Sequence, residues 1–195
     1  MKILLINNYD SFAKLIYYYF ICLQANIDIL PFNKLNITSL KKYDAFIISP
    51  GPGTAINYKI IFDILNIFLK KKYFLGVCLG MQIIGTYLGY NLVKLKTPTH
   101  GIKRKIKVLD PFDPLFISFP KSFNVALYNS WAFHYNTFFN LNNNIFISSL
   151  DKHNLIMSFY SNELKINAIQ FHPESILSFN GIKLYSNWLN LIKNS

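Results

Sequence analysis

Three residues in two short segments have the types needed for nucleophilic catalysis. Cys78 stands between Gly76 and Gly80, and His172 and Glu174 stand two residues apart near the end of the chain. A thiolate can attack a carbonyl carbon, an imidazole can carry the proton, and a carboxylate can orient the imidazole and stabilise its charged form. These segments would form one reactive site if the fold brings them together.

The sequence around Cys78 predicts a buried strand, a tight turn and a helix. An apolar run at residues 73–77 leads into Gly-x-Cys-x-Gly, and apolar residues recur at helical spacing over 79–88. The flanking glycines permit a sharp corner without Cβ clashes, as in Gly-x-Ser-x-Gly hydrolases. The positive end of the helix dipole favours thiolate over thiol there. Cys22 lies in an apolar run, where we expect an inert cysteine.

The second segment, residues 170–175, closes the last predicted strand. Residues i and i+2 of an extended chain point to the same side, so His172 and Glu174 can act on one target. Pro173 disfavours helix at His172, which supports the extended form. An isolated histidine is more often a satisfied core or surface residue, and this carboxylate spacing is what favours His172 as the base.

The other histidines do not compete for this role. His100 and His153 are interpreted as loop residues, and His134 has no carboxylate at a useful spacing. Neither cysteine has a second Cys or His at ligand spacing, so we expect no metal site.

The elements that position these residues indicate an α/β fold. Strands are expected at 2–6, 26–30, 43–48 and 73–77, with helices at 11–24, 57–70, 79–88 and 181–192. Further strands are expected at 92–95, 102–109, 123–128, 145–149, 155–160 and 166–171. We predict one domain over residues 1–195, with an open, mostly parallel sheet flanked by helices and a smaller antiparallel addition in the second half.

This arrangement predicts where a ligand would bind. Residues 7–11, residues 49–53 and Cys78 all follow predicted strands. Ligands of open parallel sheets bind beyond the carboxyl ends of the strands. We therefore expect these segments to gather at one edge of the sheet.

Composition is typical of one globular domain. The chain has 195 residues, 52% of them hydrophobic, and only two cysteines, which leaves no disulfide framework. The apolar run after Met1 is too short for a signal peptide, and no segment has the length of a membrane span. We expect a soluble cytoplasmic protein, or one of an organelle stroma if a plastid-type genome encodes it.

A formal net charge of +11 raises the hypothesis of nucleic-acid binding. The lysines, however, are spread in ones, twos and threes without a recognisable binding motif, and the chain is rich in residues with A- and T-rich codons. We interpret the charge as mutational bias in an AT-rich genome, which a gene of balanced base composition would contradict. We expect neither nucleic acid nor membrane among the partners.

Together these motifs resemble those of class I glutamine amidotransferases. Residues 76–82 (GVCLGMQ) resemble the family's nucleophile segment, and residues 171–174 (FHPE) resemble its base segment. The resemblance spans nearly the whole chain and implies a flavodoxin-like α/β fold. Residues 8–12 and 49–53 are similar to the branch that serves chorismate-using enzymes, the glutaminase component of anthranilate synthase or of aminodeoxychorismate synthase.

The resemblance implies hydrolysis of L-glutamine with release of ammonia, with Cys78 as nucleophile, His172 as base and Glu174 as orienter. It implies that the backbone N–H groups of Gly53 and Leu79 form the oxyanion hole. The glutamine-binding positions that it implies are Gly51, Pro52, Gly53, Gln82, Ser130 and Trp131. No cofactor is expected on this chain, since Mg²⁺ is expected only on the partner synthase subunit.

The same resemblance implies that the partner is a large chorismate-using synthase subunit, because one glutaminase domain fills the chain. We interpret the chain as the anthranilate synthase glutaminase of tryptophan biosynthesis, with the aminodeoxychorismate synthase glutaminase of folate biosynthesis as the alternative. Two more distant enzymes stay open: the carbamoyl-phosphate synthase small subunit, which an absent N-terminal domain disfavours, and a γ-glutamyl hydrolase. A basic binding module that keeps the fold without turnover is the non-enzyme alternative.

Three positions depart from this branch. Asn7 stands where Asp is usual, Met81 where His is usual, and Asn129 begins an Asn-Ser-Trp run in place of His-Ser-aliphatic. Methionine at position 81 is familiar elsewhere in the class and does not predict inactivity. Asn7 and Asn129 are candidates for altered coupling to a partner or for drift.

Overall fold

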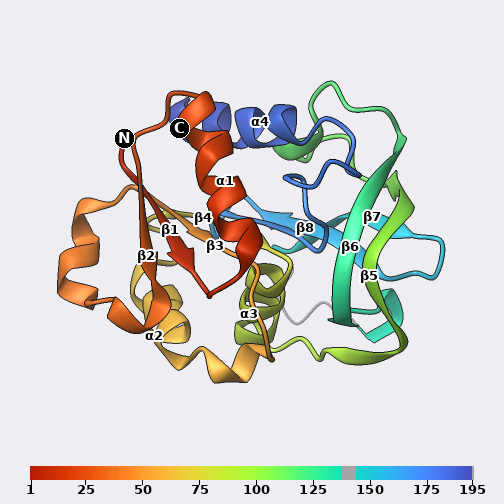
Figure 1. Cartoon of the computed structure of the whole chain (residues 1–195), viewed down its shortest axis with the longest axis horizontal. Helices are drawn as coiled ribbons and strands as arrows, with labels where there is room; N and C mark the ends of the chain where they lie inside the picture. The colour runs from red at the N-terminus through yellow and green to blue at the C-terminus, as the bar shows by residue number, and fades with distance from the viewer. Residues whose placement is uncertain (138–143, 195) are drawn as a thin grey trace.

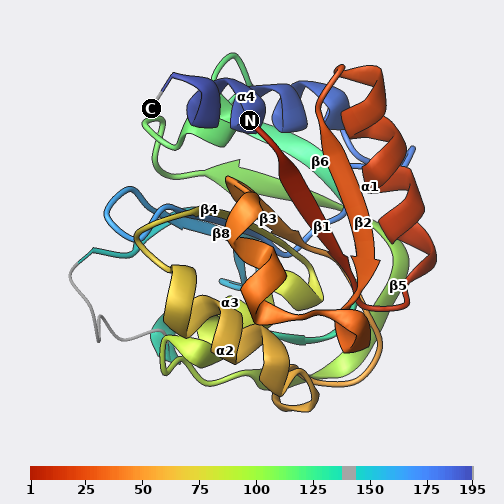
Figure 2. The same ribbon diagram turned by 90° about the vertical axis from the view of Figure 1, so that its left-hand side faces the viewer.

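A computed structural model of the chain describes residues 1–137 and 144–194. Within these residues a nine-stranded sheet, in the order β2-β1-β3-β4-β9-β8-β7-β5-β6, lies between helices (Figures 1 and 2). The strands and helices are β1 (Ile3–Asn7), α1 (Ser11–Cys22), β2 (Ile27–Pro31), β3 (Ala45–Ile48), α2 (Lys59–Phe68), β4 (Tyr73–Val77), α3 (Leu79–Tyr87), β5 (Val93–Val108), β6 (Ser122–Ala132), β7 (Phe146–Asp151), β8 (Ile156–Ser161), β9 (Ile166–Ile169) and α4 (Gly181–Lys193). Short 3₁₀ turns occupy Phe32–Lys34, Ile37–Lys42, Ala55–Asn57, Pro114–Phe116 and Tyr135–Thr137.

Strands β2, β1, β3, β4 and β9 pair in parallel and form the half of the sheet that is covered on both faces. In β1, Ile3 and Leu5 belong to the core on one face, whereas Leu4 and Ile6 belong to the core on the other. Because both faces are buried, the strand is an unbroken apolar run instead of an alternating one.

The helices divide between these two faces. Helices α1 and α4 cover one face, and α2 and α3 cover the other (Figure 2). Helix α4 packs through Leu184 and Trp188, with the Trp188 ring 5.9 Å from that of Phe20 on α1, whereas Leu191 is only partly buried. The Asp10 side chain accepts a hydrogen bond from the backbone N–H of Phe12 (2.7 Å) and so caps α1.

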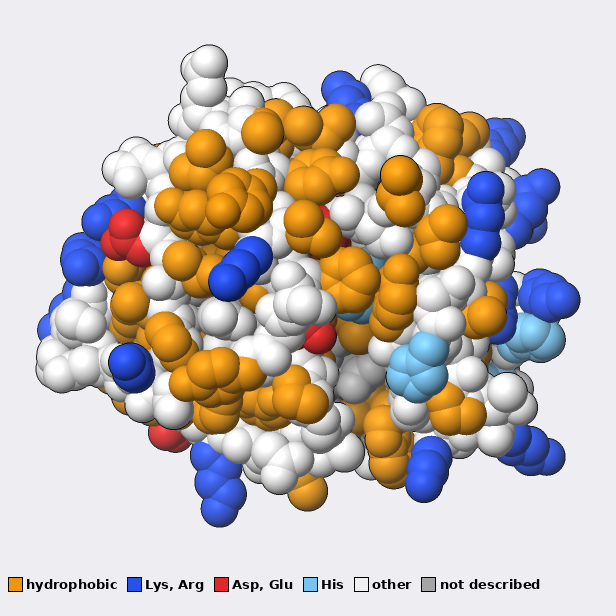
Figure 3. Space-filling model, in the orientation of Figure 1, with side chains coloured by type: hydrophobic (Ala, Val, Ile, Leu, Met, Phe, Trp, Pro, Cys, Tyr) orange, Lys and Arg blue, Asp and Glu red, His pale blue; other side chains and the backbone are white. Residues whose placement is uncertain are grey.

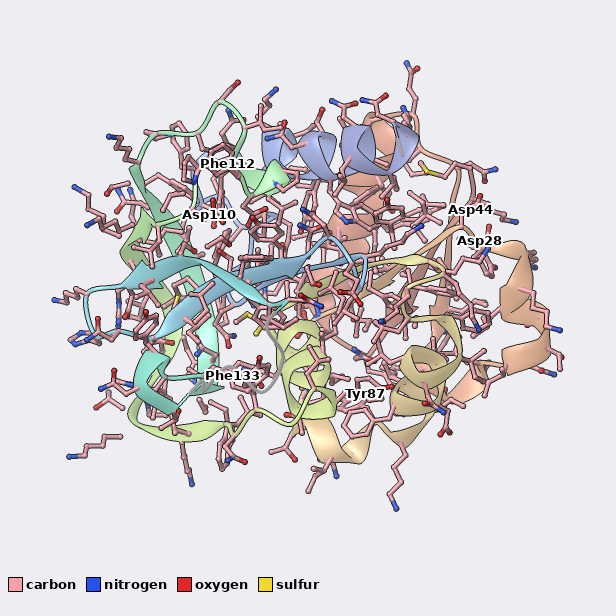
Figure 4. The ribbon with its side chains drawn as sticks, turned by 180° about the vertical axis from the view of Figure 1, so that it is seen from behind. Asp28, Asp44, Tyr87, Asp110, Phe112 and Phe133 are labelled. Atoms are coloured by element: carbon pink, nitrogen blue, oxygen red, sulfur yellow. The ribbon has the colours of Figure 1, made fainter. Side chains whose placement is uncertain are left out.

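Strands β8, β7, β5 and β6 pair antiparallel and extend the sheet, with β5 and β6 side by side in Figure 1. The two strands predicted at 92–95 and 102–109 are one strand, β5, with register shifts near Thr99 and His100. The prediction of two strands was wrong because Pro98 and Gly101 read as breaks, whereas a long ribbon accommodates them as bulges. Beyond β6, Phe133 (labelled in Figure 4) fills the space that a side chain at Gly85 of α3 would need.

The predicted fold class, a mostly parallel sheet with an antiparallel addition in the second half, is confirmed. On the face shown in Figure 3, Lys and Arg side chains are dispersed around the outline and do not form one patch. Among the described residues no helix is both long and apolar enough to cross a membrane.

Candidate active site

Cys78 lies at the corner between β4 and α3. Its backbone has φ +52° and ψ −104°, and its side chain is buried among the ends of the parallel strands. A positive φ costs a non-glycine residue on the order of 1–3 kcal/mol, so the surrounding structure must impose it. The backbone N–H of Cys78 donates to the carbonyl of Ile169 on β9 (2.8 Å), and its carbonyl accepts from Gln82 (3.1 Å).

The glycines around Cys78 are required by close backbone packing. A Cβ on Gly76 would lie 2.7 Å from the backbone of Gly80, and a Cβ on Gly80 would clash with the carbonyl of Ile48 on β3. Helix α3 therefore packs directly against β3 and β4, which sets the direction of the cysteine. The predicted strand, turn and helix agree with this geometry.

His172 and Glu174 form a buried pair whose Nδ1 and Oε1 atoms lie 2.8 Å apart. The expected extended conformation was wrong: β9 ends at Ile169, and the Ser175 N–H donates to the His172 carbonyl (3.1 Å), which closes a turn. Proline favours the second position of such a turn, and Pro173 occupies it. The two side chains thus meet across a turn and not along one side of a strand.

Helix α4 supports this turn from behind. A Cβ on Gly181, the first residue of α4, would clash with the Pro173 carbonyl, so helix and turn are in close contact. The hydroxyl of Tyr185 on α4 donates to Glu174 Oε2 (2.8 Å). Burial first, and the Glu174 charge second, raise the pKa of Tyr185 well above its usual value, so Tyr185 remains a donor at neutral pH. Nothing in the sequence distinguishes Tyr185, because it is an ordinary core position of an amphipathic helix.

The His172 ring is held between aromatic side chains. The ring centres of Phe12 and Tyr128 lie 4.8 and 4.9 Å from that of His172. Burial by itself would lower the pKa of His172, but the charges of Cys78 and Glu174 raise it well above 6.5. Its Nε2 is buried and makes no hydrogen bond of ordinary geometry with the described residues. Because Nδ1 is paired with Glu174, a proton that His172 holds on Nε2 faces Cys78, whose contact is among the causes of the raised pKa.

A cavity of about 710 Å³ opens in front of Cys78 and His172. It collects loops that follow β1, β3 and β4, as predicted from the carboxyl ends of parallel strands, together with residues of β5 and β6. Its lining includes every position expected to bind glutamine: Gly51, Pro52, Gly53, Gln82, Ser130 and Trp131. Glu174 does not line the cavity and lies behind His172.

The residues expected to form the oxyanion hole are also at this cavity. Leu79 is the first residue of α3, where a backbone N–H has no partner within the helix. Gly53 has φ +78°, which favours glycine, and a Cβ on Gly51 would lie 2.6 Å from Cβ of Asn8. Gly51 therefore packs closely against Asn8 and so holds the loop at the cavity, and the roles of the Gly53 and Leu79 N–H groups stay a prediction.

Protein groups hold the side chain of Gln82 in place. It is buried, and its Nε2 donates to the carbonyl of Trp131 (2.8 Å) and to Oε1 of Gln170 (3.1 Å). Gln170 is fully buried and donates from Nε2 to Cys78 Sγ (3.5 Å). Gln170 was missed as a site residue because no pattern distinguishes a buried polar residue at a strand end from a solvated one.

The three departures have separate structural outcomes. Asn7 Oδ1 accepts from the Tyr9 N–H (2.8 Å), a role that an Asp oxygen would fill equally. Met81 is fully buried in the core beside α2 and does not line the cavity. Asn129 lines the cavity, and its Nδ2 donates to the Trp131 carbonyl (3.0 Å).

Two further residues considered in the sequence, His100 and Cys22, lie in different places relative to the cavity. His100 lies in β5 and lines the cavity, so its interpretation as a loop residue was wrong. Cys22 is exposed at the end of α1. Over residues 1–137 and 144–194, no group of three or more His, Cys, Asp or Glu is arranged to hold a metal ion.

A cysteine at a strand-to-helix corner, beside a buried histidine–carboxylate pair, defines an α/β protein of the nucleophile-elbow type. A family model described as glutamine amidotransferase class-I matches residues 4–191. The chain belongs to the class I glutamine amidotransferase family, as the motifs predicted.

Individual proteins are similar over nearly the full length. The chain is 36% identical over 194 residues to a Haemophilus influenzae protein provisionally named anthranilate synthase component II, covering 97% of this chain and 96% of that protein. It is 32% identical over 191 residues to aminodeoxychorismate synthase component 2 of Serratia marcescens, covering 96% of this chain and 99% of that protein. A solved structure from Thermoplasma acidophilum, provisionally named a GMP synthase subunit, has a TM-score of 0.87 at 21% identity over 100% of this chain and 94% of its own, and supports the fold alone.

Proposed function

We propose that this chain is the glutaminase subunit of a chorismate-using synthase, releasing ammonia from L-glutamine for a large subunit that makes anthranilate. The observation that carries the proposal is the buried His172–Glu174 pair beside Cys78, at a cavity whose lining includes the 51–53 loop. Membership of the class I family names glutamine as the amide.

The first half of the reaction forms a thioester. The Cys78 sulfur attacks the side-chain carbonyl carbon of glutamine, a C–S bond forms, and the carbonyl electron pair moves to oxygen. The N–H groups of Gly53 and Leu79 stabilise this oxyanion, and removing one such donor costs about 2.7–4 kcal/mol in an enzyme where it was measured. His172 gives its proton to the departing nitrogen, and ammonia leaves as the C–N bond breaks.

The second half regenerates the cysteine. Neutral His172 takes a proton from water, and the hydroxide attacks the thioester carbon through a second oxyanion at the same donors. The C–S bond breaks, glutamate leaves, and the proton on His172 is ready for the next glutamine. Glu174, held by Tyr185, stabilises the imidazolium in both halves.

The large subunit is proposed because the relatives are named as components of two-part synthases. Ammonia released into water at neutral pH is mostly protonated and loses its nucleophilicity. A tight complex with a sheltered route between the two sites preserves free ammonia for chorismate. Any Mg²⁺ belongs to that large subunit in this proposal.

The test measures ammonia release from glutamine by the native chain with a chorismate-using large subunit. Cys78→Ala is the variant, and Cys22→Ser is the matched control because Cys22 is exposed and far from the cavity lining. We expect activity in the native chain and in Cys22→Ser, and a loss of roughly four or more orders of magnitude in Cys78→Ala. Equal rates in the native chain and Cys78→Ala would end the proposed mechanism.

Analysis of the amino product made from chorismate separates the two synthases. Anthranilate is expected, in keeping with the 36% identical relative, and aminodeoxychorismate is the alternative suggested by the 32% identical one. The assay supplies each type of large subunit in turn, since both reactions consume the same ammonia. Product from only the aminodeoxychorismate subunit would overturn the anthranilate assignment and keep the glutaminase chemistry.

A further inference from the structure

A chain of buried amide groups leads from the antiparallel half of the sheet to the nucleophile. The backbone carbonyl of Trp131 accepts from Asn129 Nδ2 (3.0 Å) and from Gln82 Nε2 (2.8 Å). Gln82 Nε2 also donates to Gln170 Oε1 (3.1 Å), and Gln170 Nε2 donates to Cys78 Sγ (3.5 Å). These contacts join β6, α3 and the end of β9.

The Trp131 carbonyl determines the orientation of the Gln82 and Gln170 side-chain amides. A backbone carbonyl can only accept, so Gln82 must present its NH₂ group to Trp131. One N–H of that group goes to Trp131 and the other to Gln170, which must then offer its oxygen to Gln82. The NH₂ group of Gln170 is left to face the sulfur. The Trp131 carbonyl thus determines that Cys78 meets a donor instead of an acceptor.

Gln170 reaches the sulfur from the protein interior. Its side chain is fully buried and does not line the cavity that contains Cys78 and His172. Its backbone N–H donates to the Met157 carbonyl (2.8 Å), which holds the main chain in place. A buried amide is costly unless its groups are paired, and here both ends are paired.

We propose that Gln170 is a positioning residue that holds the Cys78 sulfur by hydrogen bonding from behind, in an orientation that the Trp131 carbonyl determines through Gln82. The inference rests on the proposed role of Cys78 as nucleophile. A donor binds a thiolate more strongly than a neutral thiol, so this contact favours the charged form and directs it toward the cavity. It differs from the oxyanion donors because it acts on the sulfur before attack and weakens as the C–S bond forms.

This role has a signature that a packing role lacks. Of the titratable groups around Cys78, His172 interacts with it directly, Glu174 lies behind His172, and the same cavity is lined by Tyr9, Asp10, His100 and Tyr128. All of them are kept in every variant below, so a difference between variants reports the amide contact. A stabilised thiolate is present at lower pH but is intrinsically less nucleophilic. Loss of the Gln170 donor should therefore lower the rate of Cys78 alkylation at low pH. At high pH the rate should be unchanged or higher. A defect of packing alone would slow the reaction at every pH.

The test measures alkylation of Cys78 by iodoacetamide across a series of pH values, without glutamine or a large subunit. The Cys22→Ser background leaves Cys78 as the only thiol, since the chain has two cysteines. Gln170→Met keeps the volume and removes the donor, and we expect the pH midpoint of alkylation to rise by about one unit, with rates roughly tenfold lower below the midpoint. Gln170→Glu directs a carboxylate at the sulfur and should raise the midpoint further.

Two further variants complete the design. Gln82→Met removes the contact that orients Gln170 and should shift the midpoint in the same direction by less, so it tests the proposal even if a Gln170 variant fails to fold. Asn187→Leu replaces a buried amide whose Nδ2 donates to the Leu115 and Ile117 carbonyls, and should leave the midpoint unchanged. Thermal unfolding identifies variants that are folded.

An unchanged midpoint in folded Gln170→Met and Gln170→Glu, or a uniform slowing at every pH, would overturn the inference. Alkylation requires no turnover of glutamine, so this outcome is distinct from failure of the proposed function. A native chain that never releases ammonia would defeat the proposed function and leave the alkylation result interpretable.

Discussion

The parallel and antiparallel halves of the sheet meet at one cavity but are built differently where they meet it. The parallel half supplies the proposed reacting groups at corners set by close backbone contact, such as Gly80 against Ile48. The antiparallel half supplies cavity walls held by side-chain hydrogen bonds, such as Thr99 Oγ1 to Asn129 Oδ1 (2.9 Å). Backbone contact leaves little room for adjustment, whereas hydrogen-bonded walls can change in sequence while the catalytic geometry stays constant.

This difference predicts how substitutions should act. Changes in the parallel half should affect folding or the rate of the chemical steps. Changes in the antiparallel half should affect glutamine binding or alter how stability depends on pH. Four substitutions probe this division, from the largest expected effect to the smallest.

Gly80→Ala tests the close packing of the parallel half. The added methyl group would meet the Ile48 carbonyl, and we expect the free energy of unfolding to fall by about 3 kcal/mol or more. Gly101→Ala is the matched change in β5, where φ is +67° but the added Cβ would make only an ordinary contact with the Tyr128 ring (3.7 Å), and should cost only about 1–2 kcal/mol. Urea unfolding measures both, and equal losses would contradict the proposed difference between the halves.

Asp113→Asn tests a buried charge of the antiparallel half, in the segment between β5 and β6 near the labelled Asp110 and Phe112 (Figure 4). Burial raises the pKa of Asp113 from 3.8 to about 6, opposed by hydrogen bonds from Ser148 and from the Leu115 N–H, and the nearby Asp110 charge adds to the rise. The folded state therefore holds the proton more tightly than the unfolded state. For this reason the free energy of unfolding of the native chain falls as the pH rises from about 4 through 6.

The variant removes this penalty while Asn can still accept from Leu115. We expect Asp113→Asn to match the native chain near pH 4 and to be more stable by up to about 3 kcal/mol near pH 8. Urea unfolding at both pH values measures the difference. If the difference in unfolding free energy between the native chain and Asp113→Asn does not change with pH, ionisation of Asp113 is excluded as its cause.

Tyr185→Phe tests support of the base from the parallel half. The change removes the donor to Glu174 Oε2 without removing the ring, so one oxygen of a buried carboxylate loses its partner. We expect kcat for ammonia release to fall roughly tenfold with little change in KM. Tyr19→Phe is the control, because Tyr19 packs edge-on against Tyr185 (5.8 Å between ring centres) and makes no contact with Glu174 among those described. A rise in KM alone would show that Tyr185 acts on binding.

Asn129→Leu tests a cavity wall of the antiparallel half. The change removes one of the two donors to the Trp131 carbonyl, to which Gln82 still donates. It also removes the side-chain acceptor for Thr99, which keeps the Asn129 backbone carbonyl as an acceptor. We expect KM for glutamine to rise about threefold to tenfold with kcat nearly unchanged. A loss of kcat larger than that of Tyr185→Phe would contradict the division between the halves.

Local pattern was sufficient to predict the nucleophile corner and the fold class. The apolar run, the two glycines and the helical spacing around Cys78 are adjacent in sequence, and each constrains the backbone within a few residues. Unbroken apolar strands likewise predict a sheet covered on both faces. The rule that ligands bind beyond the carboxyl ends of parallel strands predicted that residues 49–53 lie near Cys78. The cavity lining agrees with this prediction.

Other features depend on contacts between residues that are distant in sequence. The turn at His172 is set by contact with Gly181 and Tyr185 of α4, and the continuity of β5 is set by its pairing with β6. Cys22 is exposed although its segment is apolar, because α1 buries only one side.

The sequence by itself therefore determined which residues could react and at which corner of the chain, since glycine and apolar spacing act locally. Only the tertiary structure decided what surrounds them. Gln170 and Tyr185 carry no distinguishing pattern in sequence, and each gains its partner, Cys78 or Glu174, from a segment that folding brings alongside. A buried hydrogen bond requires both groups to arrive at the same point, and pattern along one segment does not encode that meeting.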